Sequence, residues 1–289
     1  MNFYKINKEY SFILFFFTLI FLVIEVINLS YEIPFLNLIC FFLISSIGIT
    51  HGALDDSKGF KILNRYKVKQ KYLFYFAYIF TSLLVILFWL IFPLITLSSF
   101  LFIASYHFGK EDSYFIKIKK NRIINLFFLL KGSIVILAPL VFHNQETLEI
   151  FKILNVNYSY INDEVLISIL VLSFLSNFFI TKDSIVSIVD WSTVLFLNLS
   201  FSPLIAFTIY FCFLHSVRHS FSLIYEIDKK NFNNGAKKFL KKALPLTVVT
   251  AILFIVSVYV LTNYYVLDDA ILKVIFIGLA SLTFPHILL

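Results

Sequence analysis

The chain has 289 residues, of which 60% are hydrophobic and only 14% are charged, and its mean hydropathy is +0.90. Soluble globular chains carry about 25% charged residues, so this chain lacks the polar surface to cover itself in water. The composition therefore excludes a cytosolic enzyme and a disordered protein. The formal net charge of +7 does not indicate a nucleic-acid binder, because most basic residues lie in short runs between apolar stretches. We interpret the chain as an all-α integral membrane protein, with residues 1–289 forming a single polytopic domain.

The apolar runs predict about ten membrane-spanning helices. The first run, from Phe12 to Leu29, follows Lys5 and Lys8. It is longer than a signal-peptide core and no small-residue cleavage site follows it, so we expect a membrane helix there. Because a spanning helix needs about 20 mostly apolar residues, we expect spans at 10–30, 33–53, 72–92, 94–109, 123–142, 165–181, 184–201, 203–224, 244–264 and 269–289.

The distribution of charge supports this layout. Of the 24 Lys and Arg residues, 20 lie in the amino-terminal segment or in even-numbered loops, whereas the odd-numbered loops are acidic or neutral. Ten helices with both termini cytoplasmic satisfy the positive-inside rule, which indicates a multi-pass protein of the cell (inner or plasma) membrane. Pro93 and Pro203 lie where one helix should end and the next begin. If the short spans 94–109 and 184–201 are re-entrant, eight helices cross the membrane.

The histidines are few and unevenly placed. One of the six, His143, falls at the outer end of the fifth span. The other five fall toward the cytoplasmic ends of even-numbered spans: His51, His107, His215, His219 and His286. A single histidine near a helix end is usually a capping or interfacial residue. Five at one depth are harder to explain in that way, because ionisable residues within membrane spans are costly and mark functional sites.

The spacing of these histidines suggests a metal site. His215 and His219 are four residues apart and share one helix face, so they can bind one ion together. That pair alone is as well explained by packing, but with His51 and His107 it makes a four-nitrogen site. Imidazole ligands suit Fe, Cu, Zn and Ni, and no thiolate clearly accompanies them, since Cys212 lies about one turn deeper.

Two acidic residues lie close to the predicted ligands. Asp55 follows His51 by four residues, and Asp112 follows His107 by five. A carboxylate that receives the second ring N–H of a ligand histidine fixes its tautomer. The alternative is that both are helix-end acids that face water.

Other charged residues within the spans have no assigned chemistry. Lys131 lies near the middle of the fifth span and is expected to face the bundle interior beside an unidentified partner. Asp190 is either a membrane-embedded partner of the site or an interfacial acid at a helix start, and we expect the latter. Arg218 is expected to snorkel or to pair with an acid.

Four short sequence boxes surround these histidines: His51-Gly52-Ala53-Leu54-Asp55, His107-Phe108-Gly109 with Asp112, Tyr210-Phe211-Cys212 ahead of the His215–His219 pair, and Pro285-His286. Together they resemble the Brp/Blh family, the membrane β-carotene 15,15′-dioxygenases of bacteria and archaea that make retinal for microbial rhodopsins. The resemblance extends from the second span to the carboxyl end.

The resemblance implies a reaction and a set of site residues. It implies that an Fe²⁺ ion is held by four histidines, here His51, His107, His215 and His219, and that O₂ cleaves the central double bond of β-carotene to give two all-trans-retinal molecules. It also implies a functional link to a microbial rhodopsin. Candidates for a supporting or substrate-contacting role are Asp55, Asp112, His286, Tyr106 and Tyr210.

Two other classes of membrane protein remain open. A di-iron membrane hydroxylase or desaturase typically needs about eight histidines, and this chain has six. A histidine-rich metal transporter or a haem-binding membrane protein is the non-enzymatic alternative, although transporters favour broken helices with ligands near mid-bilayer.

Cys40 and Cys212 lie inside apolar runs and are not a disulfide framework. The sequence has no phosphate-binding glycine loop, GxSxG, HExxH or CxxC motif.

Overall fold

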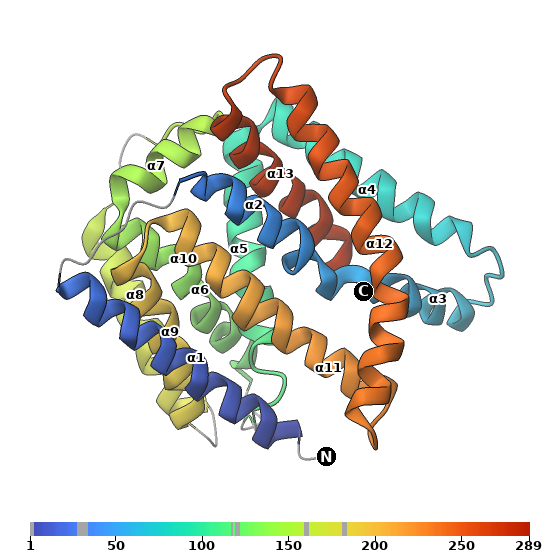
Figure 1. Cartoon of the computed structure of the whole chain (residues 1–289), viewed down its shortest axis with the longest axis horizontal. Coiled ribbons are helices and arrows are strands. Elements are labelled where there is room, and N and C mark those ends of the chain that lie inside the picture. The colour runs from blue at the N-terminus through green and yellow to red at the C-terminus, as the bar shows by residue number, and fades with distance from the viewer. Residues whose placement is uncertain (1–2, 28–33, 117, 119–121, 159–161, 181–183) are drawn as a thin grey trace.

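The computed structural model describes residues 3–27, 34–116, 118, 122–158, 162–180 and 184–289, and for His51 it describes the backbone alone. Its regular elements are helices (Figure 1). They are α1 (Phe3–Val26), α2 (Leu36–Ser46), the 3₁₀-helix η1 (Gly48–Leu54), α3 (Asp55–Arg65), α4 (Tyr72–Ile91), α5 (Pro93–Glu111), α6 (Ile124–Phe142), α7 (Asn144–Ile153), α8 (Asp163–Ile180), α9 (Ser184–Ser200), α10 (Pro203–Ile209), the π-helix η2 (Tyr210–Ser216), α11 (Val217–Ile227), α12 (Phe232–Leu261) and α13 (Leu267–Ile287).

The predicted all-helical architecture is confirmed. Within the described part of the chain, seven helical stretches are long and apolar enough to cross a membrane: Phe3–Val26, Leu36–Arg65, Tyr72–Ile91, Ile124–Phe142, Pro203–Ile227, Phe232–Leu261 and Leu267–Ile287. The other three predicted spans coincide with α5, α8 and α9, which are not among these seven. Several apolar helices of this kind indicate a multi-pass membrane protein.

Two features of the helices were not expected from the sequence. The predicted span 33–53 is divided into α2 and η1, and the amphipathic helix α3 follows it directly. The short helix α7 lies in what was predicted to be an outer loop. Pro93 and Pro203 do occupy the first positions of α5 and α10, where a missing N–H costs nothing.

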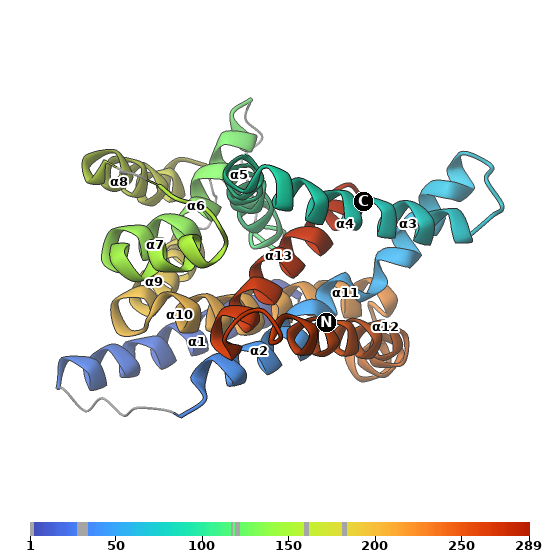
Figure 2. The same cartoon turned by 90° about the horizontal axis from the view of Figure 1, so that it is seen from above.

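The helices pack so that α13 lies at the centre. Seen from above, α13 runs obliquely between a layer that contains α2, α10 and α12 and a layer that contains α4 and α5 (Figure 2). Most of its apolar stretch is buried, whereas little of α1, α4 or α12 is. The carboxyl-terminal end of α13, which carries His286, is therefore surrounded by other helices. The exposed apolar side chains of α1, α4 and α12 form the surface suited to lipid.

Helices α5 and α6 approach each other closely at two glycines. A Cβ atom at Gly109 would lie 1.8 Å from the backbone oxygen of Phe128, and one at Gly132 would lie 1.9 Å from the backbone oxygen of Ser105. Small residues of this kind let membrane helices approach at backbone distance. The contact fixes the end of α5 that carries His107.

The span that carries His215 and His219 is not a regular α-helix. It begins as α10, widens into the π-helix η2 at Tyr210–Ser216 and continues as α11. A π-turn adds a residue to the helical turn and is frequently found at functional sites. Here it carries His215, whereas His219 lies in the regular helix α11 that follows.

Candidate metal centre

Four histidines from four helical elements form one buried cluster. The ring centroid of His107 in α5 lies 5.5 Å from that of His215 in η2 and 5.2 Å from that of His286 in α13. The centroid of His286 lies 6.0 Å from that of His219 in α11. All four side chains are buried, with 1–7% of their surface exposed. The structure therefore brings together three of the four predicted ligands, along with His286.

Three of these rings hydrogen-bond to a carboxylate through Nδ1. His215 Nδ1 lies 2.9 Å from Asp112 Oδ1, and His219 Nδ1 lies 2.9 Å from Glu111 Oε2. His286 Nδ1 lies 2.8 and 2.9 Å from the two oxygens of Asp55. A carboxylate beside Nδ1 holds the proton on that nitrogen, so Nε2 carries the lone pair that a metal ion requires. The carboxylates thus prepare three imidazoles as nitrogen donors.

Asp112 and Asp55 are buried and each binds a histidine ring, so neither is a helix-end acid that faces water. Each carboxylate binds a histidine that is distant in sequence, His215 or His286, and not a neighbour in its own sequence box. Glu111 was not singled out by the sequence analysis at all. Its position four residues after His107 is the signal that could have identified it, because residues four apart share a helix face.

Both oxygens of Asp112 are engaged. Tyr210 donates its hydroxyl to Asp112 Oδ2 at 2.7 Å, while His215 binds Oδ1. Asp112 directly follows α5 and Tyr210 begins the π-helix, so this carboxylate joins the helix of His107 to the helix of His215. Tyr210 is buried and its hydroxyl is committed to Asp112.

Asp55 also accepts a hydrogen bond from a tyrosine hydroxyl. Tyr78 in α4 donates to Asp55 Oδ2 at 3.1 Å, and its hydroxyl also lies 3.2 Å from the backbone oxygen of Leu282 in α13. Asp55 is the first residue of α3, so its carboxylate connects α3, α4 and α13.

A buried ion pair lies behind Asp112. Arg218 in α11 binds both oxygens of Asp190 in α9 at 2.8 Å. Its guanidinium also donates to the Ser11 hydroxyl at 2.8 Å and to the backbone oxygen of Asp112 at 3.5 Å. Asp190 is 3% exposed. The expectation that Asp190 is an interfacial acid at a helix start was therefore wrong, because the pairing with Arg218 compensates its burial. The expectation that Arg218 pairs with an acid is confirmed.

Lys131 faces the bundle interior, as the sequence predicted. Its ammonium group donates to the hydroxyl of Ser113 at 3.0 Å. A cavity of about 20 Å³, enough for roughly one water molecule, is lined by Lys131, Asp112, Asp190 and Tyr210 among others. The lining thus combines the basic Lys131 with the acidic Asp112 and Asp190.

The remaining predicted residues have separate outcomes. The backbone of His51 lies on η1, but its side chain lies outside the described residues, so its part in the cluster stays a prediction. Tyr106 contacts α6, through a hydrogen bond of 3.3 Å to Asn125 and a ring contact with Phe128. His143 binds the backbone oxygen of Asn198 through Nε2.

The donor set suits an ion that prefers nitrogen ligands. Among the residues that the structure describes, no three His, Cys, Asp or Glu side chains form a ready metal site. Three pairs of rings nevertheless have the spacing of two ligands on one ion, because two imidazoles at a metal–nitrogen distance of about 2.1 Å have centroids roughly 4.6–6 Å apart. The observed separations of 5.2, 5.5 and 6.0 Å fall within that range. Imidazole donors whose other nitrogens bind carboxylates suit iron and other late first-row metals.

Comparison with known proteins identifies the family of the chain. The profile of the family described as beta-carotene 15,15′-dioxygenase matches residues 42–289, which include all of the clustered histidines. The chain belongs to this family. Within it, the beta-carotene 15,15′-dioxygenase of uncultured marine bacterium 66A03 is 27% identical over 255 residues, covering 86% of this chain and 90% of the relative. No solved structure matches the chain.

Proposed function

We propose that this chain binds Fe²⁺ and uses O₂ to cleave β-carotene at its central 15,15′ double bond, giving two molecules of all-trans-retinal. The observation that carries the proposal is the buried cluster in which His215 and His219 each bind a carboxylate through Nδ1 and lie with His107 in one group of rings. Membership in a family of dioxygenases supports the chemistry.

The proposed iron ligands are His51, His107, His215 and His219. Bound iron would supply the activation of O₂, and one oxygen atom would end in each retinal. The protein's own residues prepare the site. Asp112 and Glu111 keep the protons of His215 and His219 on Nδ1, so that these ligands stay neutral and point the other nitrogen at the ion. Burial of the rings excludes bulk water from the centre.

The surroundings suit an apolar substrate. β-Carotene partitions into the bilayer, so a membrane-embedded enzyme can take it up laterally and bind it by burial of apolar area with few polar contacts. Phe108 and Phe211 pack against His215, with ring centroids 4.8 and 5.8 Å from it. We propose that such aromatic side chains hold the polyene beside the ion. Because its hydroxyl binds Asp112, we assign Tyr210 to supporting that carboxylate.

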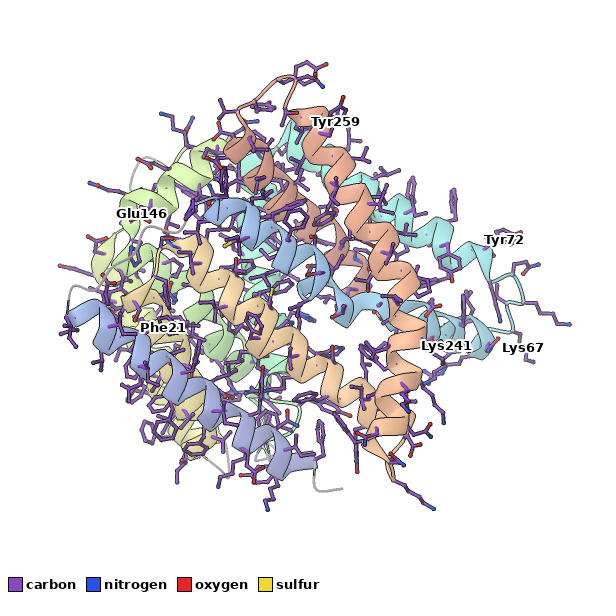
Figure 3. The ribbon with its side chains drawn as sticks, viewed as in Figure 1. Phe21, Lys67, Tyr72, Glu146, Lys241 and Tyr259 are labelled. Carbon is purple, nitrogen blue, oxygen red and sulfur yellow. The ribbon has the colours of Figure 1, made fainter. Side chains whose placement is uncertain are left out.

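We also propose the finer topology. Residues 1–289 would form one domain of ten spans, with both termini on the cytoplasmic side of the cell membrane and the retinal passed to a microbial rhodopsin. The distribution of charged side chains supports the orientation: Lys67 and Lys241 lie on one side of the array and Glu146 on the opposite side (Figure 3). The positive-inside rule places the lysines in the cytoplasm.

The test is expression in a bacterium that accumulates β-carotene, with pigment loss and retinal measured by chromatography. The wild-type chain should bleach the cells and form retinal, and His107→Ala should do neither. His143→Ala is the matched control, since His143 lies outside the cluster, and it should behave as wild type.

Three outcomes would count against parts of the proposal. Unchanged colour with well-expressed, iron-loaded protein would overturn the carotenoid reaction and favour metal transport. A Soret band in the purified protein would favour haem binding. Longer apocarotenals in place of retinal would keep the enzyme class and discard the central bond.

A further inference from the structure

We propose that His286 is an additional ligand of the same metal ion, held in place by Asp55 and Tyr78. This inference rests on the proposed function, because it adds a donor to the proposed iron centre. His286 lies three residues before the last residue of the chain, within the stretch that the family profile matches.

The first argument is position. The ring of His286 is closer to that of His107 (5.2 Å between centroids) than the ring of His215 is (5.5 Å). It also lies 6.0 Å from the ring of His219. The ring of His286 is therefore a neighbour of two of the proposed ligands, and the side chain is 6% exposed.

The second argument is that a carboxylate binds Nδ1 of His286, as it does in two of the proposed ligands. Its Nδ1 binds a buried carboxylate at 2.8 Å, as Nδ1 of His215 binds Asp112 and Nδ1 of His219 binds Glu111. This arrangement places the lone pair on Nε2. A histidine that served only to pack against its neighbours would not need a dedicated buried carboxylate, whose desolvation is costly.

The third argument is that the carboxylate itself is fixed. Tyr78 donates to Asp55 and also reaches the backbone of Leu282, one turn before His286. This tyrosine therefore ties the carboxylate to the helix that carries the histidine. Metal ligands are commonly oriented by such outer contacts, and loss of one contact typically lowers metal affinity 10–100-fold.

The fourth argument links His286 to the predicted box around His51. A Cβ atom at Gly52 would lie 3.4 Å from Asp55 Oδ2 and 3.9 Å from His286 Nδ1. The backbone next to His51 thus lies directly against the His286–Asp55 pair. The carboxyl-terminal histidine and the first sequence box meet at one place in the structure.

The experiment compares purified wild type, His286→Ala and the control His143→Ala after loading with Fe²⁺. X-ray absorption counts the coordinated imidazoles, and the electron paramagnetic resonance spectrum of the nitric oxide adduct reports the symmetry of the iron. We expect His286→Ala to hold one imidazole fewer, to show an altered nitrosyl spectrum and to lose iron to a chelator at least tenfold faster. Added imidazole should restore the spectrum. His143→Ala should match wild type.

A second variant gives a positive signal even if His286→Ala does not fold. In His286→Cys loaded with Co²⁺, a thiolate at position 286 should produce a sulfur-to-cobalt charge-transfer band, because thiolate is a strong ligand for such ions. His143→Cys should produce none beyond that of wild type. The band would support the proposal, and its absence in a folded, cobalt-loaded protein would overturn it.

The outcomes separate this inference from the proposed function. If wild type and His286→Ala bind iron with the same imidazole count and the same nitrosyl spectrum, His286 is not a ligand, whatever the activity, while the dioxygenase proposal stands. If wild type binds no iron at all, the proposed function fails and the inference fails with it.

Discussion

Tyr210 and His215 bind the two different oxygens of one buried carboxylate, Asp112, from the two ends of a single π-turn. In a regular α-helix, residues five apart do not lie on one face, because the turn closes after 3.6 residues. The wider turn at Tyr210–Ser216 brings them into line. The π-helix therefore has a concrete consequence: Asp112 is held by two donors and can fix the ring of His215.

Removal of the Tyr210 hydroxyl should weaken iron binding without removing a ligand. In Tyr210→Phe, Asp112 loses one of its hydrogen bonds, and hydrogen bonds to charged groups contribute about 1.5–3 kcal/mol. We expect iron affinity to fall about tenfold or more, with the imidazole count unchanged, as measured by chelator titration and X-ray absorption. Tyr106→Phe is the control, because its hydroxyl contacts Asn125 in α6. Equal affinities of the two variants would contradict this role for Tyr210.

Replacing the Glu111 carboxylate by an amide should make His219 a weaker ligand for iron. In Glu111→Gln the amide can still accept a hydrogen bond from Nδ1 but no longer carries the charge that fixes the proton there. We expect a 10–100-fold loss of iron affinity and a matching fall in retinal formation at limiting iron, measured against iron concentration. Excess iron should restore most of the activity.

Glu226→Gln offers a matched control for this change. Glu226 is a surface acid whose carboxylate contacts the exposed Tyr114 hydroxyl at 3.4 Å, outside the histidine cluster. Its iron affinity should equal that of wild type. If Glu111→Gln also binds iron as tightly as wild type, the carboxylate does not set the tautomer of His219.

The fold class and most of the cluster could be predicted from the sequence, because both follow from local patterns. Apolar runs of spanning length mark α1, α4, α6 and α13 directly. The common depth of the histidines follows from their positions near the ends of such runs. The pairing partners could not be predicted, since Asp112 with His215 and Asp55 with His286 join residues 103 and 231 positions apart. Only the packing of α5, η2, α3 and α13 brings them together.

Asp190 shows why the sequence misled at one position. An acid six residues from the start of an apolar helix has the spacing expected of an interfacial residue. What places it in the core is Arg218, on a helix almost thirty residues later, whose guanidinium binds both carboxylate oxygens. A buried charge is tolerated when a partner compensates it, and no local pattern reveals that partner.

The glycine contact between α5 and α6 should be sensitive to a single methyl group. In Gly132→Ala the new Cβ would meet the backbone oxygen of Ser105 at 1.9 Å, so the two helices must separate. We expect a loss of several kcal/mol in stability, because overpacking a backbone contact costs at least about 1–3 kcal/mol. Thermal unfolding in detergent measures it. Gly278→Ala should cost less, since its Cβ would meet only the movable ring of Phe254, at 2.7 Å.

The Arg218–Asp190 pair should be far more damaging to break than to remove. In Asp190→Asn or Arg218→Leu, one buried charge stays without its counter-charge, which typically costs about 3–5 kcal/mol. The double variant Asp190→Leu/Arg218→Leu removes both charges, and such replacements are often neutral or stabilising. We expect each single variant to unfold at a clearly lower temperature than the double variant in detergent, because an unpaired charge, and not the lost attraction, dominates the cost. If the losses of stability in the two single variants instead add up to the loss in the double variant, Ser11 and the backbone of Asp112 suffice to support Arg218 without Asp190.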